Sequence, residues 1–241
     1  MRFDDPELVR REYASEERFL ARRVTFVDYV KGQNAEQLAL EALAEVEPAR
    51  VLEVGCGTGA FAERVARELG ASVVALDISP HMVELARRRG VEALVGTAEE
   101  LPFADETFDC AVANWVLHHV PDLDRGLAEI DRVLRPGGRF LAATFGEDDI
   151  FELWELLGDP TVGELEFSSE NGEATLRRHF DRVERRDADG VVVFPDHQAV
   201  RTFLENVIRG AELIDNLPEF EGPFVATSRQ ALFIGTRSGI R

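Results

Sequence analysis

The chain has 241 residues, of which 45% are hydrophobic and 30% charged, an ordinary globular composition that excludes a mainly disordered, collagenous or fibrous chain. Its 27 basic and 46 acidic residues leave a net charge of −19, whereas nucleic acids and anionic membranes are bound by basic faces. No apolar run approaches the ~20 residues that cross a bilayer, and the first residues lack the apolar region of a secretory signal. We therefore expect a cytoplasmic protein without nucleic-acid or membrane partners.

Helices and strands are expected to alternate along the first part of the chain. Helical spacing of apolar residues, with capping residues at the ends, predicts helices over residues 34–46, 58–70, 79–90 and 122–138. Short, nearly continuous apolar runs predict buried strands over residues 51–55, 71–77, 91–96, 108–116 and 139–145. This alternation indicates an α/β fold, a doubly wound, Rossmann-like parallel sheet with helices on both faces.

The pattern changes after Phe145. Here we expect a helix, an acidic turn-rich stretch, two strands joined by a turn at Asp189–Gly190, another helix and a late apolar strand. Their ranges are 148–157, 159–173, 180–196, 196–210 and 228–237. The chain is therefore interpreted as one domain, divided into a helical N-terminal lid, a cofactor-binding core, a cap or insertion, and a final strand. These parts are residues 1–33, 34–145, 146–227 and 228–241.

The strongest motif is the run EVGCGTG at residues 53–59, between the first predicted strand and its helix. Gly55, Gly57 and Gly59 remove side chains where the backbone turns sharply and a ligand can approach, and the following helix presents free N–H groups. Asp77 ends the second predicted strand, where a carboxylate can accept both hydroxyls of a ribose. The first half of the chain is therefore predicted to bind an adenosine-bearing cofactor.

The identity of that cofactor depends on Glu53. Gly55, Gly57 and Ala60 satisfy the loose dinucleotide fingerprint GxGxxA. An acidic residue two positions before the first glycine, however, suits an ammonium group and repels a pyrophosphate, which favours an amino-acid-bearing nucleoside over NAD. Two alternatives stay open, an NAD-dependent oxidoreductase and a non-catalytic cofactor-binding protein. The first would lack the usual Tyr-x-x-x-Lys, since Lys31 is the only lysine.

Four blocks in order resemble the class I S-adenosylmethionine-dependent methyltransferases, in the small-molecule group that includes the menaquinone/ubiquinone-biosynthesis type. They are VLEVGCGTG (51–59), VVALDISPHMVELAR (73–87), GTAEELPFADETFDCAVANWVLHHVPD (96–122) and LRPGGRFLAATF (134–145). The resemblance implies a seven-stranded sheet whose last strand is antiparallel and inserted between the fifth and sixth. It also implies methyl transfer from S-adenosyl-L-methionine to a small-molecule acceptor by in-line displacement, with S-adenosyl-L-homocysteine as the product.

The resemblance assigns roles to residues at the ends of the predicted strands. The methionine part of the cofactor would be lined by Glu53, Gly55, Cys56 and Gly57, and the sulfonium would lie beside Asn114 and Trp115. Asp77 would bind the ribose, while Ile78 and Met82 would contact the adenine.

Similar enzymes often have aspartate where this chain has Thr97, and that aspartate accepts from the adenine amino group. A threonine accepts more weakly, so we expect the contact to pass to Glu99 or to the backbone of Ala98. His119 is the one candidate general base, with packing over the cofactor as its alternative role. Without a base, catalysis would depend on proximity alone.

No metal site and no disulfide framework are expected. Cys56 and Cys110 are the only cysteines and form no CxxC pair, and the sequence has no HExxH motif. His118 and His119 are adjacent, and on a strand such neighbours point to opposite faces. The pair is therefore a poor chelate.

The acceptor is predicted from charge. Residues 146–241 carry 20 acidic and 10 basic residues, and residues 147–173 carry ten acids and no base. If this cap covers the site, its entrance is electronegative and favours a neutral or cationic small molecule. The alternative is that these acids form a solvated face away from the site. The methylated atom and the oligomeric state stay open.

Overall fold

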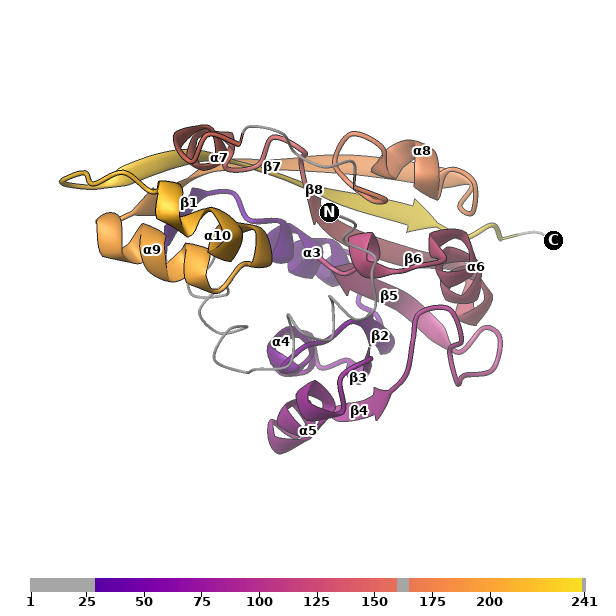
Figure 1. Ribbon diagram of the computed structural model, residues 1–241. Helices are drawn as coiled ribbons and strands as arrows, with labels where there is room; N and C mark the ends of the chain where they lie inside the picture. Colours follow the sequence, from indigo (N-terminus) through magenta and orange to yellow (C-terminus); the bar gives the residue numbers. More distant parts are fainter. Residues whose placement is uncertain (1–28, 160–164, 240–241) are drawn as a thin grey trace.

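The computed structural model describes residues 29–159 and 165–239, and its centre is one eight-stranded sheet in the order β1-β7-β8-β6-β5-β2-β3-β4 (Figure 1). The strands are β1 (Val30–Gly32), β2 (Arg50–Val54), β3 (Ser72–Asp77), β4 (Glu92–Val95), β5 (Phe108–Asn114), β6 (Leu134–Phe145), β7 (Arg182–Phe194) and β8 (Phe224–Thr236). Strands β2 to β6 pair in parallel with their neighbours in that group. β8 pairs antiparallel with both β6 and β7, and β1 pairs antiparallel with β7.

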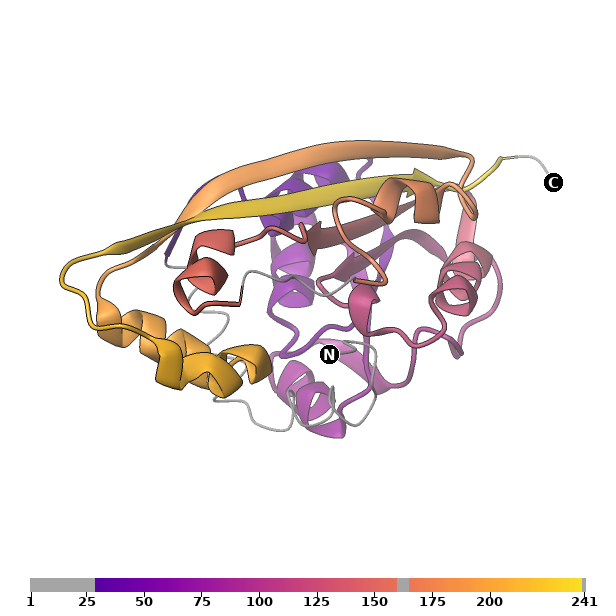
Figure 2. The ribbon, with the colours of Figure 1, turned by 45° about the horizontal axis from the view of Figure 1, so that its top comes forward.

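Helices cover both faces of the sheet (Figures 1 and 2). They are α3 (Ala35–Ala44), α4 (Ala60–Leu69), α5 (Pro80–Arg88), α6 (Leu123–Val133), α7 (Phe151–Leu156), α8 (Gly172–Leu176), α9 (His197–Glu205) and α10 (Ile208–Leu213), with short 3₁₀ turns η2 (Leu117–His119) and η3 (Ile214–Asn216). Apolar residues of α3, α4 and α5 pack on one face, and those of α6 and α8 pack on the other. The sandwich of helix, sheet and helix is the predicted doubly wound α/β architecture.

Local sequence sets the helix starts. The side chains of Asn34, Ser79, Asp122 and Asp196 each accept a hydrogen bond from a backbone amide in the first turn of the following helix. Such caps satisfy amides that have no partner within the helix. Pro80 follows Ser79 at the first position of α5, where its missing N–H costs nothing.

The predicted place of the last strand is confirmed. β8 lies between β6 and β7, which are the fifth and sixth strands of the alternating pattern, and it runs antiparallel to both. The predicted count of seven strands is one short, because Val30–Gly32 forms the additional edge strand β1. These residues fall within the predicted helical lid, residues 1–33, so its end is a strand. Residues 1–28 of that prediction lie outside the described residues.

The predicted turn at Asp189–Gly190 is wrong. β7 continues through both residues, which pair with Arg229 and Ser228 of β8. Gly190 instead faces Gly32 of β1, and a Cβ on Gly190 would lie 2.6 Å from the carbonyl oxygen of Lys31. The glycine therefore permits the close approach of a neighbouring strand, which is a recognised reason for glycine inside a strand.

The predicted boundary between a helix over 122–138 and a strand over 139–145 is also wrong. α6 ends at Val133, and β6 begins at Leu134, before the Pro-Gly-Gly run. The pairing of β6 with β5 shifts register between Phe108 and Cys110. The Pro-Gly-Gly run therefore lies in an irregular first part of a strand, where a bulge absorbs residues that pair poorly.

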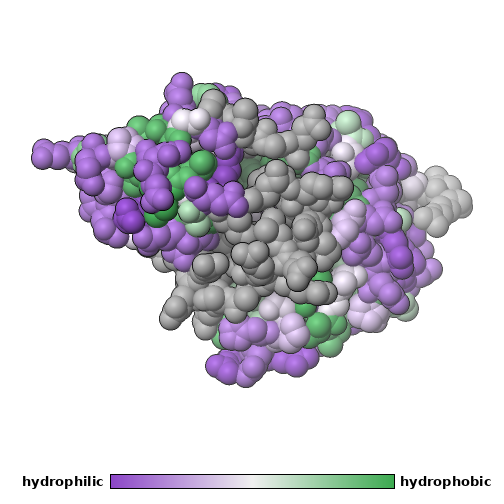
Figure 3. Space-filling model, viewed as in Figure 1, coloured by the Kyte–Doolittle hydropathy of each residue, from purple (hydrophilic) through white to green (hydrophobic). Residues whose placement is uncertain are grey.

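The predicted cap, residues 146–227, is interrupted by β7, which belongs to the sheet. β7 and β8 pair over their whole length and extend beyond the end of β6, and α9 and α10 lie at the far end of this extension (Figure 2). A third hydrophobic core fills the space between the extension and helices α7 and α9. Its buried members are Ile150, Leu153, Trp154, Leu157, Val192, Phe194, Val200, Phe203, Leu204 and Ala226. Hydrophobic surface gathers over α9 and α10 (Figure 3).

Among the described helices, none has the length and apolar character needed to cross a membrane.

Candidate active site

The candidate site lies where the strand order reverses. From β2 the chain passes to β3 on one side, and the next strand on the other side is β5. In open α/β sheets, ligands bind outside the carboxyl ends of the strands at such a point. The glycine turn that follows β2 and the residues that follow β5 flank this position.

The glycine turn is tied to β3 by hydrogen bonds. The amides of Gly55 and Cys56 both donate to the carbonyl oxygen of Leu76, at 2.7 and 3.0 Å. The Gly57 amide donates to Oδ2 of Asp77 at 2.8 Å. All three glycines of the turn have left-handed backbones, with φ of 72°, 51° and 74° for Gly55, Gly57 and Gly59. The turn and Asp77, predicted from sequence as two parts of one site, are therefore in direct contact.

Two of these glycines are required by protein packing. A Cβ on Gly55 would lie 2.4 Å from Cγ2 of Val116, and a Cβ on Gly59 would lie 2.7 Å from Cβ of Ala86. Both distances are far below the ordinary carbon–carbon contact distance of roughly 3.5–4.0 Å. Room for a ligand is thus not needed to explain Gly55 or Gly59.

Asp77 is held at the rim of the site by main-chain donors. Its Oδ1 accepts from the Ser79 amide at 2.9 Å, in addition to the bond from Gly57 to its Oδ2. Burial raises the pKa of Asp77, and the two amides oppose that rise because they stabilise the carboxylate. A carboxylate can accept about four hydrogen bonds, so Asp77 can still accept from ligand hydroxyls.

Glu53, near the end of β2, and Cys56, in the turn that follows it, are both buried, with exposed fractions of 3% and 6%. Burial raises the pKa of the Cys56 thiol, and the nearby carboxylates of Glu53 and Asp77 raise it further. The thiol therefore stays protonated at neutral pH and lacks the thiolate character of a nucleophile.

The position predicted for the adenine has two exposed apolar residues, Ile78 (39% exposed) and Val95 (52% exposed). They are brought together because Val95 is the residue of β4 that pairs with Asp77 of β3. Val95 was missed from sequence, where it reads only as the end of a buried strand. Met82 is completely buried, so it is a core side chain in this structure, and its predicted contact with adenine stays a prediction.

The segment predicted to contact the adenine amino group follows β4. Thr97 forms an isolated backbone bridge with Glu100, and Ala98 is buried. Oε1 of Glu99 accepts from the Asp122 amide at 3.2 Å. One oxygen of Glu99 is therefore engaged in holding the start of α6.

The end of β5 carries polar atoms without partners. Both amide atoms of Asn114 are buried, and within the described part of the chain they have no hydrogen-bond partner; the same is true of the Thr58 hydroxyl in the glycine turn. Leaving a buried polar group unsatisfied costs about 1–3 kcal/mol. Asn114 and Thr58 are therefore candidates for bonds to a ligand, and Thr58 was missed from sequence because its position in the turn carries no special pattern.

Trp115 turns the chain out of the sheet. Its φ of 51° is unusual for a residue other than glycine, and its amide donates to the carbonyl oxygen of Ala143 at 2.9 Å. β5 therefore ends at Asn114, two residues before the predicted end at Val116. The turn also places Val116 against Gly55.

The expectation that His118 and His119 point to opposite faces is wrong. They lie in the 3₁₀ turn η2, and their ring centroids are 4.0 Å apart. The His118 ring is buried and also packs edge-on against Phe145 at the end of β6, with centroids 5.0 Å apart. His119 is partly exposed beside it, so of the two it has the better access to a ligand.

Several acids of the predicted electronegative stretch serve structural roles. Asp148 pairs with Arg229 at 3.2 Å, and the Arg229 amide donates to Oδ1 of the buried Asp149 at 2.7 Å. Glu152 accepts from the Thr227 amide at 2.8 Å. These contacts attach the segment after β6 to β8, so part of the predicted charge stabilises the fold.

The comparisons with known proteins point to methyltransferases. Residues 52–142 match a family model described as a methyltransferase domain. The chain is 35% identical over 130 residues to a ubiquinone/menaquinone biosynthesis C-methyltransferase of Brucella anthropi, covering 47% of this chain and 49% of that protein. It is 43% identical over 112 residues to a malonyl-[acyl-carrier protein] O-methyltransferase of Methylococcus capsulatus, covering 44% of this chain and 41% of that protein. The chain thus spans about half the length of the curated relatives it matches.

Among solved structures, the chain resembles one from Thermotoga maritima described as a SAM-dependent methyltransferase, possible histamine N-methyltransferase. The two share 25% sequence identity with a TM-score of 0.58, and the match covers 92% of this chain and 94% of the other. The family match spans β2 to β6 and so contains the glycine turn, Asp77 and Asn114. The comparisons therefore show that residues 52–142 are similar to methyltransferase domains.

Proposed function

We propose that this chain transfers a methyl group from S-adenosyl-L-methionine to a small-molecule acceptor at the switch point between β2 and β5. One observation carries the proposal. The Gly57 amide and the Asp77 carboxylate meet at 2.8 Å where a nucleoside would bind, and Asn114 leaves both of its amide atoms unsatisfied at the end of the neighbouring strand.

The residues present fit this cofactor. Asp77 accepts from the ribose hydroxyls, Ile78 and Val95 offer apolar surface to the adenine, and Glu53 and the glycine turn face the methionine part. When bound, S-adenosylmethionine supplies a methyl group that is already activated by the positive sulfur. The protein then needs mainly to hold donor and acceptor in line, which can supply about 7–11 kcal/mol of the barrier.

Replacing Asp77 by alanine is expected to weaken the binding of S-adenosylhomocysteine by roughly 1.5–3 kcal/mol, or about ten- to a hundredfold, as for a lost hydrogen bond to a charged group. Titration calorimetry measures this loss. Asp109→Ala is the matched control, because Asp109 also accepts two backbone amides, those of Ala49 and Arg50 at 2.9 and 2.8 Å, at the opposite end of the sheet. Unchanged affinity in Asp77→Ala, or tighter binding of NAD than of S-adenosylhomocysteine, would contradict the proposal.

The NAD titration also separates the alternatives. An NAD-dependent oxidoreductase binds NAD and not S-adenosylhomocysteine. A non-catalytic protein binds S-adenosylhomocysteine but methylates nothing in a broad panel of acceptors. Mass spectrometry of small molecules that copurify with the native protein identifies the cofactor without any assumption about the acceptor.

For the acceptor we propose a neutral or cationic small molecule, with His119 as the general base where the acceptor must lose a proton. The net charge of −19 supports this charge preference, as does the similarity to a protein described as a possible histamine N-methyltransferase. Asp148, Asp149 and Glu152 bond to β8, so the charge preference depends mainly on the other acids of the chain. The two curated relatives are named as a C- and an O-methyltransferase, so the methylated atom is left open.

A panel of amine, phenol, quinol and phosphorylated acceptors, assayed at low and high salt, is expected to give methylation of an amine, phenol or quinol. His119→Gln should lower kcat for that acceptor by about 10²–10⁴-fold, with binding of S-adenosylhomocysteine unchanged, since a general base contributes about that factor. Salt-insensitive methylation of an anionic acceptor would overturn the charge preference. An unchanged kcat in His119→Gln would remove the base from the mechanism.

A further inference from the structure

A row of residues along one side of α6 lies against the loop that connects β4 to β5. The row begins at the N-cap residue Asp122 and continues through Gly126, Glu129 and Arg132. These positions recur every three or four residues and therefore share one side of the helix. This side is next to the apolar one that packs on the sheet through Leu123, Leu127, Ile130 and Val133. The row thus faces sideways, toward residues 97–105.

Contacts along this row hold the part of the loop nearest the site. The Asp122 amide donates to Glu99, as described above, and a Cβ built on Gly126 would lie 3.5 Å from Cβ of Ala98. Farther along, Oε2 of Glu129 accepts from the Leu101 amide at 2.9 Å. The loop therefore lies against α6 from Ala98 onward.

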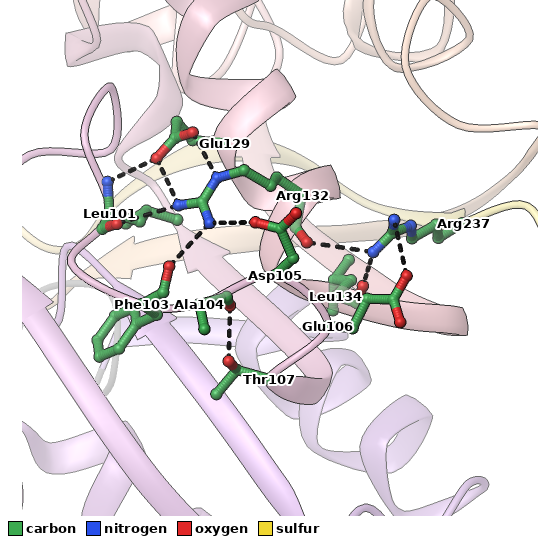
Figure 4. A network of polar contacts seen from close by, with 10 residues as sticks. All are labelled: Leu101, Phe103, Ala104, Asp105, Glu106, Thr107, Glu129, Arg132, Leu134 and Arg237. Carbon is green, nitrogen blue, oxygen red and sulfur yellow. Dashed lines mark hydrogen bonds and ion pairs between the residues drawn. The ribbon is translucent and has the colours of Figure 1, made fainter. Parts of the chain in front are cut away.

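Arg132 closes the series (Figure 4). Its Nη1 donates to the carbonyl oxygen of Phe103 at 2.8 Å, and its Nη2 donates to that of Leu101 at 3.1 Å. The same guanidinium donates to both oxygens of Glu129, at 2.7 and 2.8 Å, and pairs with Asp105 at 2.8 Å. Such two-pronged bonding fixes the planes of both groups, and it holds the pKa of Glu129 below its usual value.

Because residue 97 is a threonine, the predicted contact with the adenine amino group depends on the position of the loop's main chain. A carboxylate at that position could reach the adenine with its own side chain. With threonine there, a contact from the Ala98 backbone or from Glu99 requires that the main chain itself be placed correctly. Fixed loop geometry then takes over the role of a missing side chain.

We propose that Arg132 is a positioning residue for the cofactor. Through Glu129 and the carbonyls of Leu101 and Phe103, it fixes residues 97–105 in the conformation that recognises the adenine amino group. This inference rests on the proposed function, because it needs an adenosine-bearing ligand at the site. Arg132 itself does not touch the ligand.

The test compares Arg132→Met and Arg132→Lys with the matched control Arg237→Met in the full chain. Arg237 carries a second guanidinium in the same network, so Arg237→Met removes the same charge as Arg132→Met. It donates to the carbonyl oxygens of Leu134 and of Arg132 and pairs with Glu106 at 3.5 Å and with Asp131 at 3.8 Å (Figure 4). Within the described residues, none of these bonds reaches residues 97–105. Calorimetry measures binding of S-adenosylhomocysteine and of S-inosylhomocysteine, whose base lacks the amino group. Hydrogen exchange measures protection of the amides of residues 97–105.

Arg132→Met should bind S-adenosylhomocysteine about tenfold more weakly, the cost of about one hydrogen bond, and should bind the inosine analogue as the wild type does. Arg132→Lys should recover part of the loss, and Arg237→Met should match the wild type with both ligands. Exchange in residues 97–105 should rise in Arg132→Met and not in Arg237→Met. Equal losses for the two ligands, no loss, or unchanged exchange would overturn the inference.

The design also separates this inference from the proposed function. A wild-type chain that binds neither ligand contradicts the function, while the exchange measurement still tests whether Arg132 holds the loop. If Arg132→Met does not fold, Arg132→Lys and Glu129→Gln provide the same comparison. Each weakens the two hydrogen bonds between Arg132 and Glu129 and changes the volume of the side chain little.

Discussion

Replacing Gly55 by alanine is expected to lower the free energy of unfolding by about 2–5 kcal/mol. The left-handed conformation costs an alanine roughly 1–2 kcal/mol, and overpacking costs about 1–3 kcal/mol. At Gly55 both apply, since its φ is 72° and the new Cβ would lie 2.4 Å from Val116. Urea unfolding of the full chain measures the change.

Two variants separate the causes. Gly70 has almost the same backbone, with φ of 70°, but a Cβ there would meet nothing within 4 Å. Gly70→Ala should therefore show the backbone cost alone. The double variant Gly55→Ala with Val116→Ala should regain the steric part. If Gly55→Ala loses no more unfolding free energy than Gly70→Ala, the Val116 side chain moves aside without destabilising the fold.

The alternating core could be predicted because its signals are local. Each buried parallel strand is a short apolar run, and each following helix carries its own cap, as Ser79 and Pro80 show at α5. The wrong predictions concern residues whose conformation depends on a partner far away in the sequence. Gly190 resembles a turn glycine until β1 is placed beside it, and the count of strands fails because Val30–Gly32 is short and pairs with residues about 160 positions away.

The candidate site divides in the same way. Asp77 and the glycine turn follow from a motif, and the structure brings them into contact. Thr58, Val95 and Arg132 could not be found, because their significance lies in unsatisfied atoms, in exposure at a strand edge and in contacts to main-chain carbonyls. His118 and His119 were misjudged because a 3₁₀ turn replaces the end of the predicted strand. The roles of the individual site residues stay predictions until ligand binding is measured.

The second large effect concerns pH and Asp149. Burial raises the pKa of Asp149 to about 7, and the carboxylates of Asp148 and Glu152 add to the rise, while the Arg229 amide and the Ser228 hydroxyl oppose it. In the unfolded chain an aspartate has a pKa of about 3.9. Between these values the folded chain keeps a proton that the unfolded chain has lost. Stability should therefore fall as the pH rises from about 4 to 7, by about 1.4 kcal/mol for each pH unit from this group.

Asp149→Asn should remove this slope. The asparagine carbonyl can still accept from the Arg229 amide, and no charge has to be buried, so the variant should be more stable than the wild type at pH 8 and about equal to it at pH 4. Groups whose pKa lies below its usual value in the folded chain, such as Glu45 and Asp124, give the opposite slope at lower pH. The contributions of these groups are the same in the wild type and in Asp149→Asn, so they cancel in the difference between the two.

Asp148→Asn is the matched control, because Asp148 is exposed and pairs with Arg229 at the surface. Because burial is the largest cause of the raised pKa and the Asp148 charge a smaller one, Asp148→Asn should keep most of the wild-type fall in stability between pH 5 and 7. Urea unfolding at several pH values measures all three proteins, and equal slopes for wild type and Asp149→Asn would contradict the assignment. The result also bears on the acceptor. A protonated Asp149 contributes no negative charge at the carboxyl edge of the sheet below pH 7, so any attraction of a cationic acceptor that depends on it should strengthen as the pH rises past 7.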